Sequence, residues 1–129
     1  MEKILYKNTV IAIRVKTFKT GSIPLTDPRE PLQLVTLKHP KGTSLKAHIH
    51  TPKKRTTYKL QECILVRKGK VKIDLYTIDK KFLKYVYLTA GEILMLVNGG
   101  YGIHVLKDSE MIEIKNGPFL EDKLLIDYA

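Results

Sequence analysis

The sequence lacks several features that would assign the chain to a common structural class. It has a single cysteine, Cys63, so no internal disulfide can form, and this usage is typical of a reducing compartment. Cys63 begins an apolar run, which predicts a buried structural thiol. The longest nearly uncharged stretch, residues 93–106, is too short to cross a bilayer and contains an asparagine and three glycines. The N-terminus has no signal-peptide pattern, so we expect a cytoplasmic protein with no membrane partner.

Common catalytic signatures are also missing from the sequence. There is no nucleophile elbow, no glycine-rich phosphate loop before a helix, no Cys-x-x-Cys pair and no dinucleotide fingerprint. These absences argue against serine hydrolases, nucleotide hydrolases of the P-loop type, thioredoxin-like enzymes and Rossmann dehydrogenases.

Acidic residues are scarce, since 13 Asp and Glu face 23 Lys and Arg and give a formal net charge of +10. Such a balance can mark a nucleic-acid-binding surface. The cations, however, are mostly lysines spread along the whole chain, and residues 53–55 form the one tight cluster. Lysines also protect the exposed strand edges of β-proteins. We therefore expect a solvated surface, with nucleic acid an unlikely partner.

The apolar pattern present in the chain is that of β-strands. Residues 70–76 alternate strictly, with Val71, Ile73 and Leu75 on one face. Further strands are expected at residues 11–18, 32–37, 64–67, 82–88 and 111–115. Short turn signals separate them, and residues 20–28 and 51–59 are expected to form longer loops. No segment carries a helical stripe, so the chain is predicted to be an all-β sandwich or barrel in a single domain, residues 1–129.

Two of the four histidines form the pattern His48-Ile49-His50. On a strand, residues two positions apart project from the same face, so both imidazoles would point the same way. Gly42 precedes His48 with five residues between them, and Glu62 precedes Gly69 with six between them.

A second glycine-led stretch runs from Gly91 through Gly99 to His104. At these two stretches the sequence resembles the cupin superfamily, over a motif core of residues 32–115. The spacing departs from the family pattern at a longer loop between His50 and Glu62, a valine in place of the proline of the second motif, and a late His104. The C-terminal residues 110–123 look like those of small bacterial cupins, some of them similar to proteins encoded among polysaccharide or sugar-nucleotide genes.

The resemblance implies a cupin-type double-stranded β-helix (jelly-roll) barrel. It also implies a divalent transition metal, bound by His48, His50, Glu62 and His104, that would leave two positions for water or a ligand. The residue types suit iron, manganese, nickel, copper or zinc equally, so the metal's identity stays open. Two further interpretations also remain open, in which the site is empty or the histidines face solvent and bind nothing.

The basic cluster Lys53, Lys54 and Arg55 lies in the loop after His50 and would favour an anionic ligand if the loop covers the site. Tyr101 and Tyr58 are candidates for acid–base groups at the mouth of the site, although aromatic packing is the alternative for each.

We therefore expect a metal-dependent protein that acts on or binds a small polar or anionic molecule, for which a sugar derivative is one candidate. A non-catalytic binding or sensing module is the alternative. The apolar alternation of residues 11–18 suggests an intersubunit strand, so we expect a homodimer.

Overall fold

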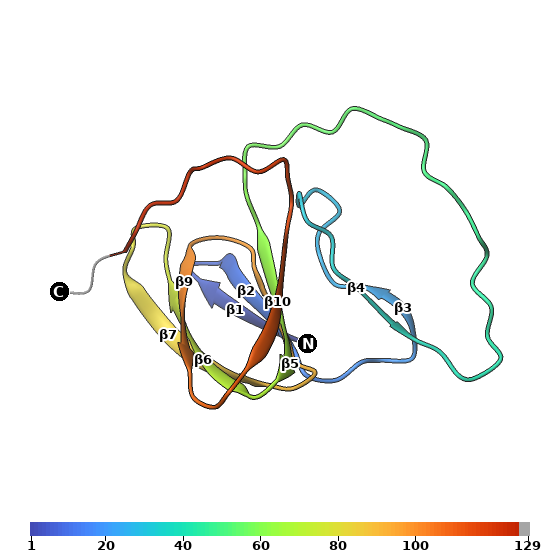
Figure 1. The fold of residues 1–129 in the computed structure, drawn as a ribbon. Helices are drawn as coiled ribbons and strands as arrows, with labels where there is room; N and C mark the ends of the chain where they lie inside the picture. Colours follow the sequence, from blue (N-terminus) through green and yellow to red (C-terminus); the bar gives the residue numbers. More distant parts are fainter. Residues whose placement is uncertain (127–129) are drawn as a thin grey trace.

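The computed structural model describes residues 1–126, which form ten β-strands and no helix (Figure 1). The strands are β1 (Glu2–Tyr6), β2 (Thr9–Val15), β3 (Gly21–Pro24), β4 (Val35–Lys38), β5 (Glu62–Lys68), β6 (Lys70–Tyr76), β7 (Phe82–Thr89), β8 (Ile93–Leu96), β9 (Gly100–Val105) and β10 (Glu110–Lys115). The all-β prediction is confirmed over this part of the chain. It contains no helix of the length and apolarity that a membrane crossing requires.

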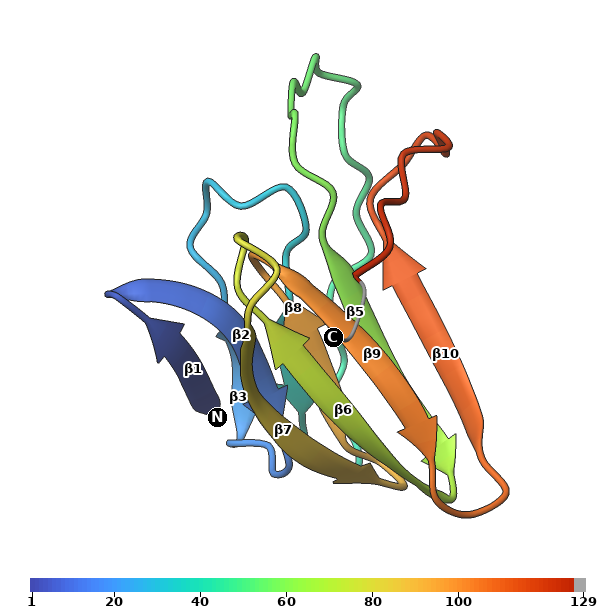
Figure 2. The same ribbon diagram turned by 90° about the vertical axis from the view of Figure 1, so that its left-hand side faces the viewer.

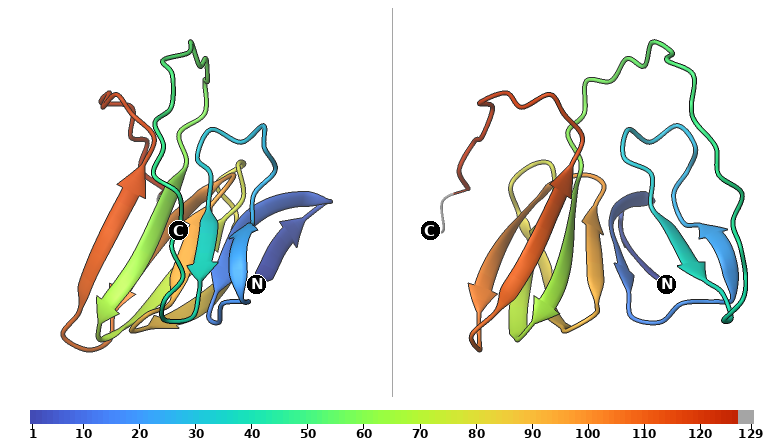
Figure 3. Two further views of the ribbon diagram at one scale, coloured as in Figure 1. Left: turned by 90° about the vertical axis from the view of Figure 1, so that its right-hand side faces the viewer. Right: turned by 45° about the vertical axis from the view of Figure 1, so that its right-hand side comes forward.

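Two antiparallel sheets face each other and enclose the main core (Figure 2). The larger has the order β1-β2-β8-β5-β10, and the smaller has the order β7-β6-β9. From β5 onward the chain crosses between the sheets at every connection except the β6–β7 hairpin: β5, β8 and β10 belong to the larger sheet, and β6, β7 and β9 to the smaller. A separate hairpin of β3 and β4 lies beside the larger sheet (Figure 3).

The strict alternation of residues 70–76 places one face of β6 in the core. Val71, Ile73 and Leu75 are completely buried and pack against Leu88 of β7 and Leu94 of β8. Burying a side chain of this size stabilises the fold by about 1.5–3 kcal/mol. The alternation that predicted this strand therefore also identified its buried face.

A second cluster lies on the opposite face of the larger sheet. Cys63 and Met95 pack there with Ile13, beneath Leu25 and Leu34 of the β3–β4 region. Burial raises the pKa of the Cys63 thiol to about 11, so the thiol stays protonated at neutral pH. The expectation of a buried structural cysteine is confirmed.

Gly99 stands at the entry to β9 and has a backbone conformation that favours glycine, with φ of 87°. A Cβ at this position would collide with the carbonyl oxygen of Tyr76. The close approach of these two backbones sets where β9 begins, and hence where Tyr101 is placed.

Two expectations about the N-terminal third are wrong. The strand expected at residues 11–18 is β2, and it lies between β1 and β8 in the larger sheet. Because both of its edges are already paired, it cannot supply an intersubunit strand. The loop expected at residues 20–28 contains β3, which pairs with β4.

The strand expected to carry His48 and His50 is also absent. Residues 43–58 have no regular structure, are exposed throughout and arch away from the barrel (Figures 1 and 3). We call residues 43–58 the detached segment. Its backbone pairs with no strand among residues 1–126, so the alternation of its side chains does not place them on the two faces of a sheet.

Candidate functional site

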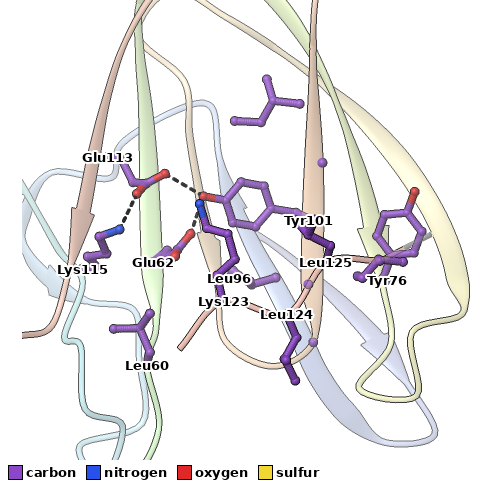
Figure 4. Close-up of a pocket in the computed structure, with 15 residues that line it drawn as sticks. Leu60, Glu62, Tyr76, Leu96, Tyr101, Glu113, Lys115, Lys123, Leu124 and Leu125 are labelled. Atoms are coloured by element: carbon purple, nitrogen blue, oxygen red, sulfur yellow. Dashed lines mark hydrogen bonds and ion pairs between the residues drawn. The ribbon is translucent and has the colours of Figure 1, made fainter. Parts of the chain in front are cut away.

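A cavity of about 580 Å³ opens between β5, β9, β10 and the C-terminal residues 123–126 (Figure 4). The two edge strands β9 and β10 flank it, since neither has a partner on its outer side among the described residues. The lining is mixed: apolar side chains of both sheets and of the C-terminal residues surround four charged groups and two phenols. The charged members are Glu62, Glu113, Lys115 and Lys123, and the phenols are those of Tyr76 and Tyr101.

The hydroxyl group of Tyr101 lies between two carboxyl groups at the wall of the cavity (Figure 4). It forms a hydrogen bond with Glu62, and its oxygen is 2.9 Å from Oε2 of Glu113. Tyr101 stands opposite Leu75 in the β6–β9 ladder, so its side chain shares the inner face of this sheet.

The hydroxyl group of Tyr101 has one proton for two carboxyl acceptors. A phenol has one proton to donate, and an ionised carboxylate only accepts. Tyr101 can therefore donate to only one of the two glutamates at a time. The two carboxyl groups compete for this one proton.

Lys115 forms an ion pair with Glu113. Its Nζ lies 3.0 Å from Oε1 of Glu113, and this ion pair holds the pKa of Glu113 below its usual range. Burial and the contacts with Glu62 and Glu113 raise the pKa of Tyr101, so the phenol is neutral at physiological pH. The cavity wall thus combines a neutral acid, an ionised carboxylate and a cation.

Glu62 reaches the cavity because the start of β5 is held from several sides. The completely buried side chain of Gln61 accepts a hydrogen bond from the Leu32 backbone and donates one to the Val97 carbonyl. The Gln61 backbone N–H donates to Asn116, which follows β10. Glu62 is then the first residue of β5 and pairs with Leu96 on one side and Lys115 on the other.

His48 and His50 are far from this wall in the fold, because the detached segment carries them. Both are exposed, and their rings contact each other edge to face with centroids 5.0 Å apart. The Nδ1 atom of His48 lies 3.1 Å from the carbonyl oxygen of Lys46. The pair is adjacent, as the spacing predicts, but within one chain it has no further ligand beside it.

His104 is turned to the opposite face of its sheet from Tyr101. Its Nε2 lies 2.7 Å from Oδ2 of Asp74, and in the ladder it stands opposite Lys72. Because His104 is three positions after Tyr101, an odd number, the alternation of β9 sends the two side chains to different faces. Glu62 and His104 therefore do not converge.

The implied metal does not fit the residues as this chain places them. Over residues 1–126 no group of three or more His, Cys, Asp or Glu side chains is arranged to hold a metal ion. His48 and His50, His104, and Glu62 occupy three separate places.

The basic cluster Lys53, Lys54 and Arg55 is exposed on the detached segment and does not line the cavity. Tyr58 is fully exposed at the rim of a second hollow, formed between residues 57–62 and residues 115–123. Of the two tyrosines singled out from the sequence, the structure places Tyr101 in the cavity wall.

Sequence reasoning missed Glu113 and Lys115, although their strand was expected. Met111, on the same strand, packs against the core. The alternation from Met111 therefore carries Glu113 and Lys115 onto the inner face, where a charged residue is unusual. That departure from apolar alternation was the available signal.

Comparison with known proteins assigns the chain to no family. No family model, curated protein or solved structure matches it. Its function is therefore argued from its own residues.

Proposed function

We propose that this protein is a small cupin-type barrel that binds a small polar molecule, such as a sugar derivative or an anion, in the cavity beside Tyr101 and exchanges a proton with it. The observation that carries the proposal is the Tyr101 hydroxyl held between Glu62 and Glu113.

The order of the strands supports the barrel type. A double-stranded β-helix winds a chain back and forth between two facing sheets, and the chain from β5 to β10 does this. The glycine-led motifs lie in the same region, with Gly69 between β5 and β6 and Gly91 between β7 and β8.

The lining of the cavity favours a small ligand with both polar and apolar faces. Glu62 and Glu113 can accept hydrogen bonds from hydroxyl groups, while Lys115 and Lys123 provide positive charge for an anionic substituent. Apolar contact is available from Leu96 and Ile103 on the two sheets. A ring with hydroxyl groups and a negative substituent matches this set.

The shared proton supplies the chemistry. A general acid or base must lie within hydrogen-bonding distance of the atom that it serves, and Tyr101 is at the cavity wall. Glu113, kept ionised by Lys115, can take the phenol proton while the Tyr101 oxygen takes a proton from the ligand, and the reverse transfer returns a proton to the ligand. The cluster is thus suited to moving a proton onto or off an oxygen or an activated carbon of the ligand.

Binding without reaction is a second candidate, favoured by the pairing within the cluster. Tyr101, Glu113 and Lys115 already have partners in the protein, so they are ordered without a ligand. A set of this kind can serve recognition alone.

The test is calorimetric titration with neutral sugars, sugar phosphates, nucleotide-linked sugars and small carboxylic acids. We expect at least one class to bind, and Tyr101→Phe and Glu62→Gln each to weaken it about tenfold, as loss of one hydrogen bond to a charged group would. Tyr87→Phe on β7 is the matched control and should bind normally, because Tyr87 does not line the cavity.

Proton exchange is then followed by nuclear magnetic resonance in heavy water with the best ligand. Deuterium incorporation that disappears in Tyr101→Phe supports catalysis, and binding without incorporation supports the second candidate. Binding that is unaffected by both cavity variants would contradict the proposal.

A further inference from the structure

The detached segment has the side-chain pattern of a strand without a strand's partner. Leu45 and Ile49 are 58% and 90% exposed, and they alternate with His48 and His50. Apolar side chains of this size stabilise a protein when they are buried and not when they face water. A chain that alternates in this way is suited to joining a β-sheet. The sequence of the segment is therefore suited to forming a strand at the edge of a sheet.

A free edge exists at β9. The smaller sheet ends on this strand, which pairs with β6 alone among the described residues. Its six residues leave unpaired backbone groups along the side that borders the cavity, next to the equally unpaired edge of β10 (Figure 2). An added strand would satisfy those groups and close the opening between the two sheets.

The charges of the segment and of this opening are complementary. Residues 41–61 contain no acidic residue and six cations: Lys41, Lys46, Lys53, Lys54, Arg55 and Lys59. Residues 108–122, which include β10 at the opening, contain one cation and five acids: Asp108, Glu110, Glu113, Glu121 and Asp122. In a chain of net charge +10 this acidic stretch is an exception, and it lies where the basic segment would arrive.

The segment does not approach its own β9. It leaves β4 and arches on the side of the molecule that carries β3 and β4, whereas β9 lies on the other side of the barrel (Figures 1 and 3). A second copy of the chain can receive it without disturbing any pairing that the structure shows.

We propose that two copies of this chain exchange their detached segments, each laying residues 43–50 as a strand along the free edge of the partner's β9. A twofold axis makes the exchange reciprocal, so both openings are closed at once. The exchange also brings His48 and His50 of one copy to the edge of the other copy's cavity, where Tyr101 lies. The exchange itself stands without the proposed function, but the part that these histidines play in ligand binding rests on it.

Photo-crosslinking between labelled copies tests the exchange. Benzoylphenylalanine replaces Ile49 in two preparations of the protein, one of natural isotope content and one labelled uniformly with nitrogen-15. The two preparations are unfolded, mixed and refolded together. We expect cross-linked peptides of mixed isotope that join position 49 to β9. The control carries the crosslinker at Ile78, which is 79% exposed in the β6–β7 turn, and should give no mixed product with β9.

Products of a single isotope only, which would mean pairing within one chain, would overturn the proposal. So would a monomer of the unmodified protein in light scattering.

A proline variant tests the exchange independently. Ala47→Pro removes a backbone donor from the middle of the proposed strand, and we expect it to be a monomer by light scattering. Lys54→Pro, in the same exposed segment but outside residues 43–50, should remain a dimer. Dimeric Ala47→Pro with unchanged cross-linking would contradict the exchange.

The combined variant His48→Ala and His50→Ala separates the two proposals. It should dimerise normally, because strand pairing uses the backbone, and should bind the cavity ligand at least tenfold more weakly. Normal dimerisation with normal binding would remove the histidines from the site and leave the exchange intact. If no ligand is found at all, the cross-linking and light-scattering results still decide the exchange.

Discussion

The phenol oxygen of Tyr101 on β9 lies 2.9 Å from a carboxylate oxygen of Glu113 on β10, and this contact joins the edges of two different sheets. No backbone ladder links these strands in the described chain. The side-chain cluster therefore links β9 to β10 at the opening where we place ligand binding.

Tyr101 should ionise above the usual range of a tyrosine side chain. Burial and its two carboxyl partners raise its pKa, so absorbance at 295 nm should show a component from Tyr101 that titrates above the usual range near pH 10. A tyrosine with a raised pKa in the folded state stabilises the protein below its unfolded pKa, and this contribution is lost as the pH rises through the folded value. The late component should be missing in Tyr101→Phe and present in Tyr87→Phe.

Lys115→Gln should move the pKa of Glu113 upward toward its ordinary value. The ion pair with Lys115 is the largest cause of the lowered pKa. A lowered carboxyl pKa contributes stability above the unfolded value of 4.5, and this contribution disappears as the pH falls through the folded value. Because both side chains are 41% exposed, solvent screens the ion pair, and we expect only a small loss of stability at pH 7.

The carboxyl carbon resonance of Glu113 checks this shift directly. Lys68→Gln, at the end of β5, is the control and should leave the Glu113 titration unchanged. A Glu113 titration that is identical in Lys115→Gln would show that the ion pair is not formed in solution.

Gly99→Ala should destabilise the fold more than Gly91→Ala does. Both glycines have φ close to 87°, at 87° and 86°, so both variants carry the strain of a left-handed backbone, about 1 kcal/mol. A methyl group at position 99 also collides with the Tyr76 carbonyl, whereas nothing lies within 4 Å of one at position 91. We expect an additional loss of roughly 1–3 kcal/mol for Gly99→Ala, measured by urea denaturation. Equal losses would show that β9 can shift freely at its entry.

His104→Ala should leave the metal content of the purified protein unchanged, whatever its level. The imidazole bonds to Asp74 on the face of the sheet opposite to Tyr101, so it contributes no ligand at the cavity. Elemental analysis by mass spectrometry of the unmodified and variant proteins checks this. A loss of bound metal in His104→Ala would revive the metal site that the spacing of the histidines implies.

Local patterns in the sequence were sufficient for β6 and its buried face, but they missed β1 and β3. The alternation of Val71, Ile73 and Leu75 gives both the extent of β6 and its inner side, because a strand with one buried face must repeat every two residues. The apolar run around Cys63 likewise predicts its burial. These properties depend on neighbours in the chain.

Which side chains line the cavity depended on contacts between residues that are distant in the sequence. Which face His104 occupies follows from the register of β9 against β6, and whether residues 43–50 form a strand follows from the presence of an edge to pair with. Glu113 meets Tyr101 and Glu62 only because β5, β9 and β10 converge around one opening. The sequence by itself thus determined an all-β chain with a defined core and a pair of adjacent histidines. The tertiary structure decided that Tyr101, and not His104, faces the cavity, since strand register assigns every side chain to one face or the other.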